Sequence, residues 1–249
     1  MSRLLLHLSD LHFGRVPEGM ADALVTVSQE IAPDVVIVSG DLTQRAKIEE
    51  FEQARAFLDR LPMPQIVIPG NHDVPLYNPY GRFVERLARF RQYITEDLAP
   101  AYFDAEVAVF GINTARSLTW KNGRINARQI EAVRALLCEA APEVMRVVAT
   151  HHPSDIAREA LATWSACGAD LLLCGHLHLG ATAIEGGTLV VNAGTAISTR
   201  GRGQANSFNV IRLERRDRAA VTQWAWDDSA FVKLESSEFQ RDQNGWRVI

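Results

Sequence analysis

Short apolar runs alternate with amphipathic stretches along roughly the first two thirds of the chain. The runs are rich in valine, isoleucine and leucine, and their apolar residues are largely consecutive. Such runs are typical of strands that are buried on both faces of a sheet. We predict strands over residues 4–8, 35–38, 65–68, 107–112, 144–149 and 170–173.

The stretches between these runs have helical periodicity. Between residues 47 and 61, apolar side chains recur at spacings of three and four, which places them on one face of a helix. Asn126 can cap a second helix that continues through Leu137. The repetition of strand, helix and strand indicates an α/β layered fold with parallel strand pairs.

Beyond about Gly180 the pattern changes to short strands separated by turn residues, with little helical periodicity. We predict that this part forms an antiparallel sheet packed on the first one. Because the candidate chemistry straddles the change, we interpret residues 1–249 as one domain. The predicted strands cover residues 181–185, 188–192, 208–213 and 220–226.

The composition excludes some classes of protein. Hydrophobic residues make up 47% and charged residues 22% of the 249 residues, which is typical of a soluble globular protein. The formal net charge of -4 does not favour binding to a nucleic-acid backbone, although short arginine clusters occur at 200–202 and 215–216. No apolar run approaches the length of about 18 residues that a membrane-spanning helix needs, so we expect no membrane association.

The three cysteines, Cys138, Cys167 and Cys174, are odd in number and widely spaced. This spacing does not suggest a disulfide framework, so we expect reduced thiols and a cytoplasmic location. The N-terminus lacks an apolar stretch long enough for a signal peptide. Cys174 ends a predicted strand, where we expect a buried core residue and not a metal ligand.

Polar residues cluster directly after five of the apolar runs. In open α/β sheets, ligands bind outside the carboxyl ends of the strands, so we expect these segments to converge. Six of the seven histidines lie in them, whereas His7 lies inside the first strand and is interpreted as a hydrogen-bonded structural residue. The clustered residues are Asp10 and His12, Asp41, Asn71 to Asp73, His151 and His152, and His176 and His178.

Two of these segments carry ligand-type side chains two residues apart. In an extended chain, residues i and i+2 face the same side, so Asp10 with His12, and His176 with His178, can each offer two ligands in one direction. The whole set combines carboxylates, imidazoles and one amide without sulfur. Such a set suits ions such as Mn, Fe, Zn or Co, and we predict a metal site.

These segments resemble, in order, the motif series of the calcineurin-like metallophosphoesterase superfamily. That series runs D-x-H, G-D, G-N-H-D/E, H and G-H-x-H, and all five motifs are present here between residues 10 and 178. The resemblance implies a two-sheet β-sandwich flanked by helices. It also implies two divalent or trivalent metal ions at one edge of the sandwich, with manganese and iron favoured.

Carried over residue by residue, the resemblance implies two ion sites that share Asp41. A hydroxide that bridges the two ions would attack phosphorus in line with the leaving oxygen. His151 is preferred to its neighbour as the ligand because the family ligand usually lies two residues before the proline. One ion would be bound by Asp10, His12, Asp41 and His178, and the other by Asp41, Asn71, His151 and His176.

Other residues of these motifs have roles besides binding metal. His72 resembles the family's catalytic histidine, which binds no ion, contacts the phosphate and protonates the leaving group. Asp73 is interpreted either as orienting this turn or as a catalytic group. Gly70 lets the turn pass close to the ions, where a side chain would obstruct. His152 would lie behind the ligands or face the substrate.

Two departures count against a protein phosphatase, whose motifs read G-D-x-x-D-R-G and G-N-H-E. Here the second motif continues to Gln44 and Arg45, and the third ends in Asp73. The chain looks more like the bacterial cyclic-nucleotide and glycerophosphodiester phosphodiesterase branch, which implies a small-molecule phosphodiester substrate. The same ions serve a phosphomonoesterase or a nucleotide-lipid pyrophosphatase. A protein-binding scaffold is the non-enzyme alternative, but no ligand of the motifs is lost.

Three further interpretations concern segments around the motifs. Arg200 or Arg202 contacts substrate phosphate, because the guanidinium fork suits phosphate oxygens, or both are solvated loop charges. Residues 78–95 form either a cap over the site or a helix packed through its aromatic residues. The strand-rich segment 206–232 can offer an exposed edge for pairing in a homodimer.

Overall fold

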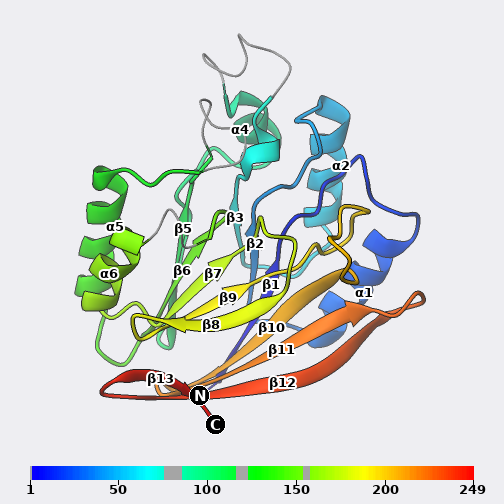
Figure 1. The fold of residues 1–249 in the computed structure, drawn as a ribbon. Coiled ribbons are helices and arrows are strands. Elements are labelled where there is room, and N and C mark those ends of the chain that lie inside the picture. Colours follow the sequence, from blue (N-terminus) through cyan, green and yellow to red (C-terminus); the bar gives the residue numbers. More distant parts are fainter. Residues whose placement is uncertain (1, 76–85, 116–122, 154–157) are drawn as a thin grey trace.

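Two mixed β-sheets face each other, and helices lie on both outer faces (Figure 1). The computed structural model of the protein describes residues 2–75, 86–115, 123–153 and 158–249. Within these ranges the structure confirms the α/β layered fold and the two-sheet sandwich that the family resemblance implies.

The first sheet contains seven strands in the described chain, in the order β13-β12-β11-β10-β1-β2-β3. β1, β2 and β3 are parallel, whereas β10 to β13 are each antiparallel to their neighbours. The strands are β1 Ser2–Leu8, β2 Val35–Ser39, β3 Gln65–Ile68, β10 Ser207–Glu214, β11 Arg218–Trp226, β12 Phe231–Asp242 and β13 Gly245–Val248.

The second sheet contains six strands in the described chain, in the order β4-β5-β6-β7-β9-β8. β5, β6, β7 and β9 are parallel, and the antiparallel β4 and β8 close the two edges. All the strands predicted from the sequence are present. The strands are β4 Ala101–Phe103, β5 Val107–Ile112, β6 Met145–Thr150, β7 Leu171–Cys174, β8 Ala181–Glu185 and β9 Thr188–Asn192.

The strands beyond Gly180 do not form a sheet of their own, so that prediction was wrong. β8 and β9 extend the second sheet, and β10 pairs with β1 from Ser2 opposite Glu214 to His7 opposite Asn209. The reason is that β2 satisfies only one side of β1. The backbone groups on the other side of a buried strand also need hydrogen-bond partners, and β10 supplies them.

Three apolar layers hold the sandwich together. The middle layer lies between the sheets and includes Ile37 of β2 and Val147 of β6. Two outer layers pack the sheets against α1 and α2 on one side and against α5 and α6 on the other (Figure 1). Burial on both faces explains the continuous apolar sequence of the central strands. The helices are α1 Met20–Ile31, α2 Ile48–Leu58, α4 Ala88–Tyr93, α5 Ala127–Glu139 and α6 Arg158–Ala166.

Both predicted helices are present. Asn126 caps α5, because its side chain accepts a hydrogen bond from the backbone N–H of Gln129 at 2.9 Å, and the side-chain oxygen of Gln129 accepts one from the backbone N–H of Asn126. In α2 the predicted apolar face is buried at Phe51 and Leu58, but Ile48 in the first turn is exposed.

The segment 78–95 lies only partly in the described residues. Its described part contains α4, in which Phe90 is fully buried in the core and the ring of Tyr93 stacks on Phe51 at a centroid distance of 6.3 Å. This part therefore follows the core-packing alternative. Tyr80 and Phe83 lie outside the described residues, and a cap formed there stays a prediction.

Most of the segment 206–232 lies inside its sheet and not at the free edge that we predicted from the sequence. β10 and β11 are hydrogen-bonded on both sides, and the edges of their sheet are β13 and β3. A homodimer therefore stays a prediction without that edge to support it. Among the described helices, none has the length and apolar character needed to cross a membrane.

The prediction of three reduced cysteines was wrong. Cys138 near the end of α5 and Cys167 just after α6 form a disulfide, with Cα atoms 4.9 Å apart. The packing of α5 against α6 brings together two residues 29 positions apart, which the spacing of three cysteines cannot show. The disulfide removes the argument from reduced thiols for a cytoplasmic location. Cys174 is free and buried, as predicted.

We expect the Cys138→Ser variant to be less stable than the wild type under oxidising conditions. A disulfide that closes a loop of this size stabilises the folded state by about 2–4 kcal/mol, largely by constraining the unfolded chain. Urea unfolding with and without dithiothreitol measures the effect. With dithiothreitol present, the two proteins should unfold at the same urea concentration. If they are also equally stable without dithiothreitol, the disulfide is contradicted.

Candidate metal centre

The five polar segments that follow the strands converge at one end of the sandwich, as predicted. β1, β2 and β3 end side by side in one sheet, and β6 and β7 end side by side in the other. Hydrogen bonds connect the segments across the sheets. The backbone N–H of His176 donates to Asp10 Oδ2 at 2.9 Å, and His151 Nδ1 lies 2.8 Å from the carbonyl oxygen of Ser39.

One group of candidate ligands surrounds Asp10. Its Oδ1 lies 3.6 Å from His12 Nε2 and 3.4 Å from His178 Nε2. The rings of these two histidines are stacked, with centroids 5.2 Å apart and an interplanar angle of 2°. All three side chains are buried, so their free ligand atoms face one another and not the solvent.

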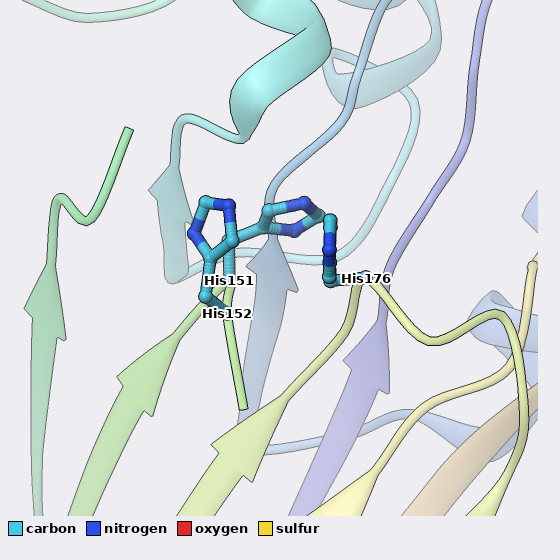
Figure 2. Close-up of side chains that lie close together, drawn as sticks. All are labelled: His151, His152 and His176. Carbon is cyan, nitrogen blue, oxygen red and sulfur yellow. The ribbon is translucent and has the colours of Figure 1, made fainter. Parts of the chain in front are cut away.

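A second group surrounds His151. Its Nε2 lies 3.3 Å from Asp41 Oδ1 and 3.2 Å from Asn71 Oδ1. The ring of His176 is edge-on to that of His151, with centroids 5.2 Å apart. Figure 2 shows the rings of His151, His152 and His176 gathered beyond the ends of β6 and β7.

Asp41 lies between the two groups. Its Oδ1 faces His151 at 3.3 Å, while its Oδ2 faces His12 at 3.7 Å. One carboxylate thus presents one oxygen to each group, which is the arrangement a bridging ligand needs.

The donor set fits metal ions. Among the buried side-chain atoms that have no hydrogen-bond partner in the described part of the chain are Asp10 Oδ1, His12 Nε2 and Asp41 Oδ2. Leaving a buried polar atom unsatisfied costs about 1–3 kcal/mol. The three atoms face one another, so a cation among them would satisfy all three at once.

The histidines are oriented as metal ligands usually are. A ligating histidine commonly donates its other ring N–H to a neighbouring acceptor. His12 Nδ1 lies 3.3 Å from the carbonyl oxygen of Thr43, and His178 Nδ1 lies 2.6 Å from Thr195 Oγ1. In each case Nε2 is left facing the carboxylates. Thr195 has no local signal in the sequence, because only the fold places the 193–206 loop beside β7.

The backbone at these positions is not extended, and the geometry that we assumed for the two spaced pairs was wrong. The φ angles are 55° at Asp10, 47° at His12, 53° at Asp41, 69° at His176 and 59° at His178. All five lie in the left-handed region, which costs residues other than glycine about 1–3 kcal/mol each. The sharp turns separate His176 from His178, and each histidine faces a different group.

Two glycines are required by close contacts. A Cβ at Gly70 would lie 2.1 Å from Asp41 Oδ1, and one at Gly175 would lie 1.8 Å from Ser9 Oγ. Contacts this short are impossible without moving the loops. The G-N-H-D and G-H-L-H turns can therefore approach the carboxylates only because glycine begins each of them.

Asp73 connects two of the turns. Its carboxylate accepts hydrogen bonds from the backbone N–H groups of Gly70, Leu42 and Thr43 at 2.8, 3.2 and 2.9 Å, and from the Thr43 hydroxyl. Burial and the charge of Asp41 raise the pKa of Asp73 to about 6, while these donors act in the opposite direction. The contacts favour the interpretation that Asp73 orients the turn.

His72 lies beside the first group of ligands, and Arg200 contacts it. His72 Nδ1 lies 2.9 Å from the carbonyl oxygen of Gln44, and Arg200 Nη1 lies 2.8 Å from His72 Nε2. Arg200 also donates to the Gln44 side chain at 3.4 Å. Arg202 is exposed in the same loop. Of the two arginines proposed from the sequence, the fold brings Arg200 to His72.

His152 is buried next to its neighbour, and its Nδ1 lies 2.7 Å from Thr114 Oγ1. Burial, followed by the nearby charges of His151 and His176, lowers the pKa of His152 to about 2. Thr114 is a site residue that was not predicted from the sequence. The signal was present, because Thr114 follows the strand 107–112 just as the selected residues follow theirs. His7 is buried and hydrogen-bonded to Ser39 at 2.9 Å, as predicted.

Charges within the site compensate one another in the absence of ions. Burial raises the pKa of Asp41, but the charge and hydrogen bond of His151 outweigh it and hold that pKa well below the ordinary value. Burial would lower the pKa of His151, yet Asp41 and Asp10 raise it to about 9. A proton on His151 thus stabilises the buried carboxylates when no metal does.

Comparison with known families gives a direct match. Residues 4–180 match the family model described as Calcineurin-like phosphoesterase. This range is more than half of the chain and contains all five motif segments.

Two curated relatives match shorter parts of the chain. One is the glycerophosphodiester phosphodiesterase GpdQ of Enterobacter lignolyticus, 38% identical over 81 residues, which cover 28% of this chain and 29% of that protein. The other is a probable cyclic nucleotide phosphodiesterase of Synechococcus sp., 30% identical over 84 residues, which cover 30% of this chain and 33% of that protein. The matched segments thus span a third or less of each relative's length.

The fold is also found in a solved structure of low sequence identity. Purple acid phosphatase PPD1 from yellow lupin seeds has a TM-score of 0.71 and 13% identity, covering 98% of this chain and 54% of that chain. At this identity the likeness shows the fold alone.

We expect the apo protein to bind divalent metal more tightly as the pH rises towards about 9. Below that pH His151 holds a proton, and a metal ligand must lose its proton to bind, so affinity should rise by about tenfold per pH unit for one displaced proton. Calorimetric titration with zinc in two buffers of different ionisation enthalpy measures the proton released near neutral pH. Affinity that does not change between about pH 6 and pH 9 would contradict this prediction.

Proposed function

Because the chain belongs to the calcineurin-like phosphoesterase family, we propose that it is a dinuclear metal-dependent phosphodiester hydrolase that acts on a small molecule. The observation that carries the proposal is the position of Asp41, which presents one carboxylate oxygen to each of two groups of ligand side chains. A structural role alone would not require buried carboxylate and imidazole atoms to face one another without partners.

The proposed ligands follow the two groups, with Asp41 shared. The mixture of nitrogen and oxygen donors suits Mn, Fe, Zn or Co, and we favour manganese and iron. Two such ions, when bound, clamp a phosphoryl group and activate a water for attack on phosphorus. One ion would be held by Asp10, His12, Asp41 and His178, and the other by Asp41, Asn71, His151 and His176.

His72 is proposed to act on the substrate itself. The carbonyl of Gln44 fixes the ring through Nδ1. Nε2, which lies 2.8 Å from Arg200 Nη1 in this structure, is the atom that would contact the phosphate and, once protonated, pass a proton to the leaving oxygen. An anionic phosphate beside the ring favours its protonated form. The ring of His72 is edge-on to His12 at a centroid distance of 4.9 Å, so a group that reaches Nε2 also lies beside the ligands.

Arg200 is proposed to bind a phosphate oxygen. Its guanidinium already lies against His72, and the planar fork of arginine suits phosphate oxygens. The same charge would neutralise part of the negative charge that develops in the transition state. Arg202 lies in the same loop but is exposed, so we propose at most an auxiliary role in attracting an anionic substrate.

The phosphodiester preference rests on the relatives. The two matched proteins are a glycerophosphodiester phosphodiesterase and a probable cyclic nucleotide phosphodiesterase. The departures from the protein phosphatase motifs at Gln44 and Asp73 agree with this. A scaffold that binds only proteins would not need the full set of buried ligand atoms.

Hydrolysis of bis(p-nitrophenyl) phosphate compared with p-nitrophenyl phosphate tests the proposal. Protein reconstituted in turn with manganese, iron, cobalt and zinc should hydrolyse the diester faster. Both substrates release the same p-nitrophenolate, so the comparison isolates the second ester group and the lower charge of the diester. Faster hydrolysis of the monoester would replace the proposal with a phosphomonoesterase. Failure to bind any of the four metals, together with no hydrolysis, would favour the scaffold.

The Arg200→Ala variant should lose about 10- to 100-fold in kcat/KM for the diester, since a hydrogen bond to a charged group is worth about 1.5–3 kcal/mol. Arg202→Ala is the matched control, because it removes the same charge from the same loop, and its kcat/KM should fall much less. Steady-state kinetics of the manganese-loaded proteins give both values. An equal loss in both variants would mean that only the general charge of the loop matters.

A further inference from the structure

Three imidazoles, those of His151, His152 and His176, present ligand atoms that all lie within 4.8 Å of one another. Figure 2 shows that the three rings lie beyond the ends of β6 and β7, and the ring centroids of His152 and His176 are 4.6 Å apart, closer than those of His151 and His176 at 5.2 Å. By distance alone, His152 is as good a candidate for binding an ion as its neighbour. The hydrogen bonds at the far side of each ring decide between them.

The ring of His151 is fixed by an acceptor. Its Nδ1 lies 2.8 Å from the backbone carbonyl oxygen of Ser39. A carbonyl oxygen cannot donate a hydrogen bond, so Nδ1 must carry the hydrogen. When the ring is neutral, Nε2 therefore holds a lone pair, and this atom faces Asp41 and Asn71. His151 is held in the tautomer that can bind a metal ion.

The ring of His152 is fixed by a hydroxyl group instead. Its Nδ1 lies 2.7 Å from Thr114 Oγ1, and the same oxygen accepts a longer hydrogen bond of 3.4 Å from the backbone N–H of His152. Within the described residues, the structure shows no other acceptor for the hydroxyl hydrogen of Thr114. The hydroxyl oxygen could accept from both nitrogens, but its own hydrogen would then have no acceptor among the described residues. Accepting from the backbone and donating to Nδ1 gives that hydrogen a partner as well, so the contacts favour this arrangement.

This assignment places the ring hydrogen of His152 on Nε2. His152 is only 2% exposed, and its Nε2 has no hydrogen-bond partner in the described part of the chain. The ring is tilted against His176, with centroids 4.6 Å apart. A Cβ at Gly123 would lie 2.3 Å from His152 Nδ1, so the loop at Gly123 closely covers the ring. A buried, unused donor is therefore held beside the second group of ligands.

We propose that Thr114 holds His152 in the tautomer with hydrogen on Nε2, so that His152 binds no ion and donates a hydrogen bond to a phosphate oxygen of the substrate beside His176. This inference rests on the proposed phosphodiester hydrolase. His151 and His152 are adjacent at the end of one strand, but the first binds metal and the second binds substrate. The Ser39 carbonyl beside the first ring and the Thr114 hydroxyl beside the second determine these roles. Thr114 is a positioning residue, which acts through His152.

The nitrogen spectrum of the apo protein tests the tautomer without any activity. In a long-range ¹H–¹⁵N correlation at neutral pH, the signals of His152 should show a protonated Nε2 and an unprotonated Nδ1, and those of His151 should not show this pattern. The His152→Ala variant assigns the signals by their loss. A protonated Nδ1 on His152 would overturn the proposal.

Metal content and phosphate binding test the separate role of each histidine. Zinc-loaded His152→Ala should retain the same number of ions per chain as the wild type but bind inorganic phosphate about tenfold more weakly, as expected for one lost donor to an anion. His151→Ala should lose zinc. If His152→Ala also binds one ion fewer, His152 is a ligand and the proposal fails.

Thr114 variants separate positioning from a purely structural role. Thr114→Val keeps the size of the side chain but has no hydroxyl, and its kcat for the diester should fall about tenfold while Thr114→Ser restores it. A lower melting temperature with an unchanged His152 tautomer and unchanged phosphate binding would mean that Thr114 only stabilises the loop. If wild-type protein hydrolyses no diester with any metal, the proposed function fails, whereas the tautomer and the metal count still decide this inference.

Discussion

The burial of two carboxylates side by side is the constraint on which the centre depends. Asp10 is fully buried and Asp41 is 1% exposed, and each has an oxygen without a hydrogen-bond partner in the described part of the chain. An uncompensated buried charge is far more costly than any single contact nearby can offset. Imidazoles from both sheets surround the pair, and a proton on His151 or a bound cation compensates the charge. The two sheets are thus joined electrostatically at this end.

The local backbone follows from the same constraint. Five candidate ligands have left-handed backbone conformations, and strain of this kind persists only where the surroundings fix it. The parallel strands below these residues fix where each turn begins. Asp73 then ties the turn after β2 to the turn after β3 through its hydrogen bonds to Gly70 and Thr43. The rigid sandwich supplies the stability, and the turns carry the strain.

The sequence predicted the centre better than it predicted the sheets. Residues such as Asp41 and His151 could be found because parallel strands buried on both faces have a plain apolar signal, and polar side chains directly after them mark one edge. The partner of β1 could not be found this way, since pairing between β1 and β10 joins segments about two hundred residues apart without any local signal. The contact between Cys138 and Cys167 and the place of Thr195 behind His178 likewise depend on tertiary packing. The left-handed turn at Asp10 was missed because spacing alone does not distinguish it from extended chain.

The pairing of β10 with β1 limits how far the protein can be truncated from its C-terminal end. The family match ends at residue 180, yet β9 lies between β7 and β8, and β10 covers the open side of β1. A fragment trimmed to the five motifs would expose the backbone of two central strands, and such bare strand edges promote aggregation. The segment that contains the five motifs is therefore shorter than the folding unit, and the C-terminal strands belong to that unit although they contain none of the motifs.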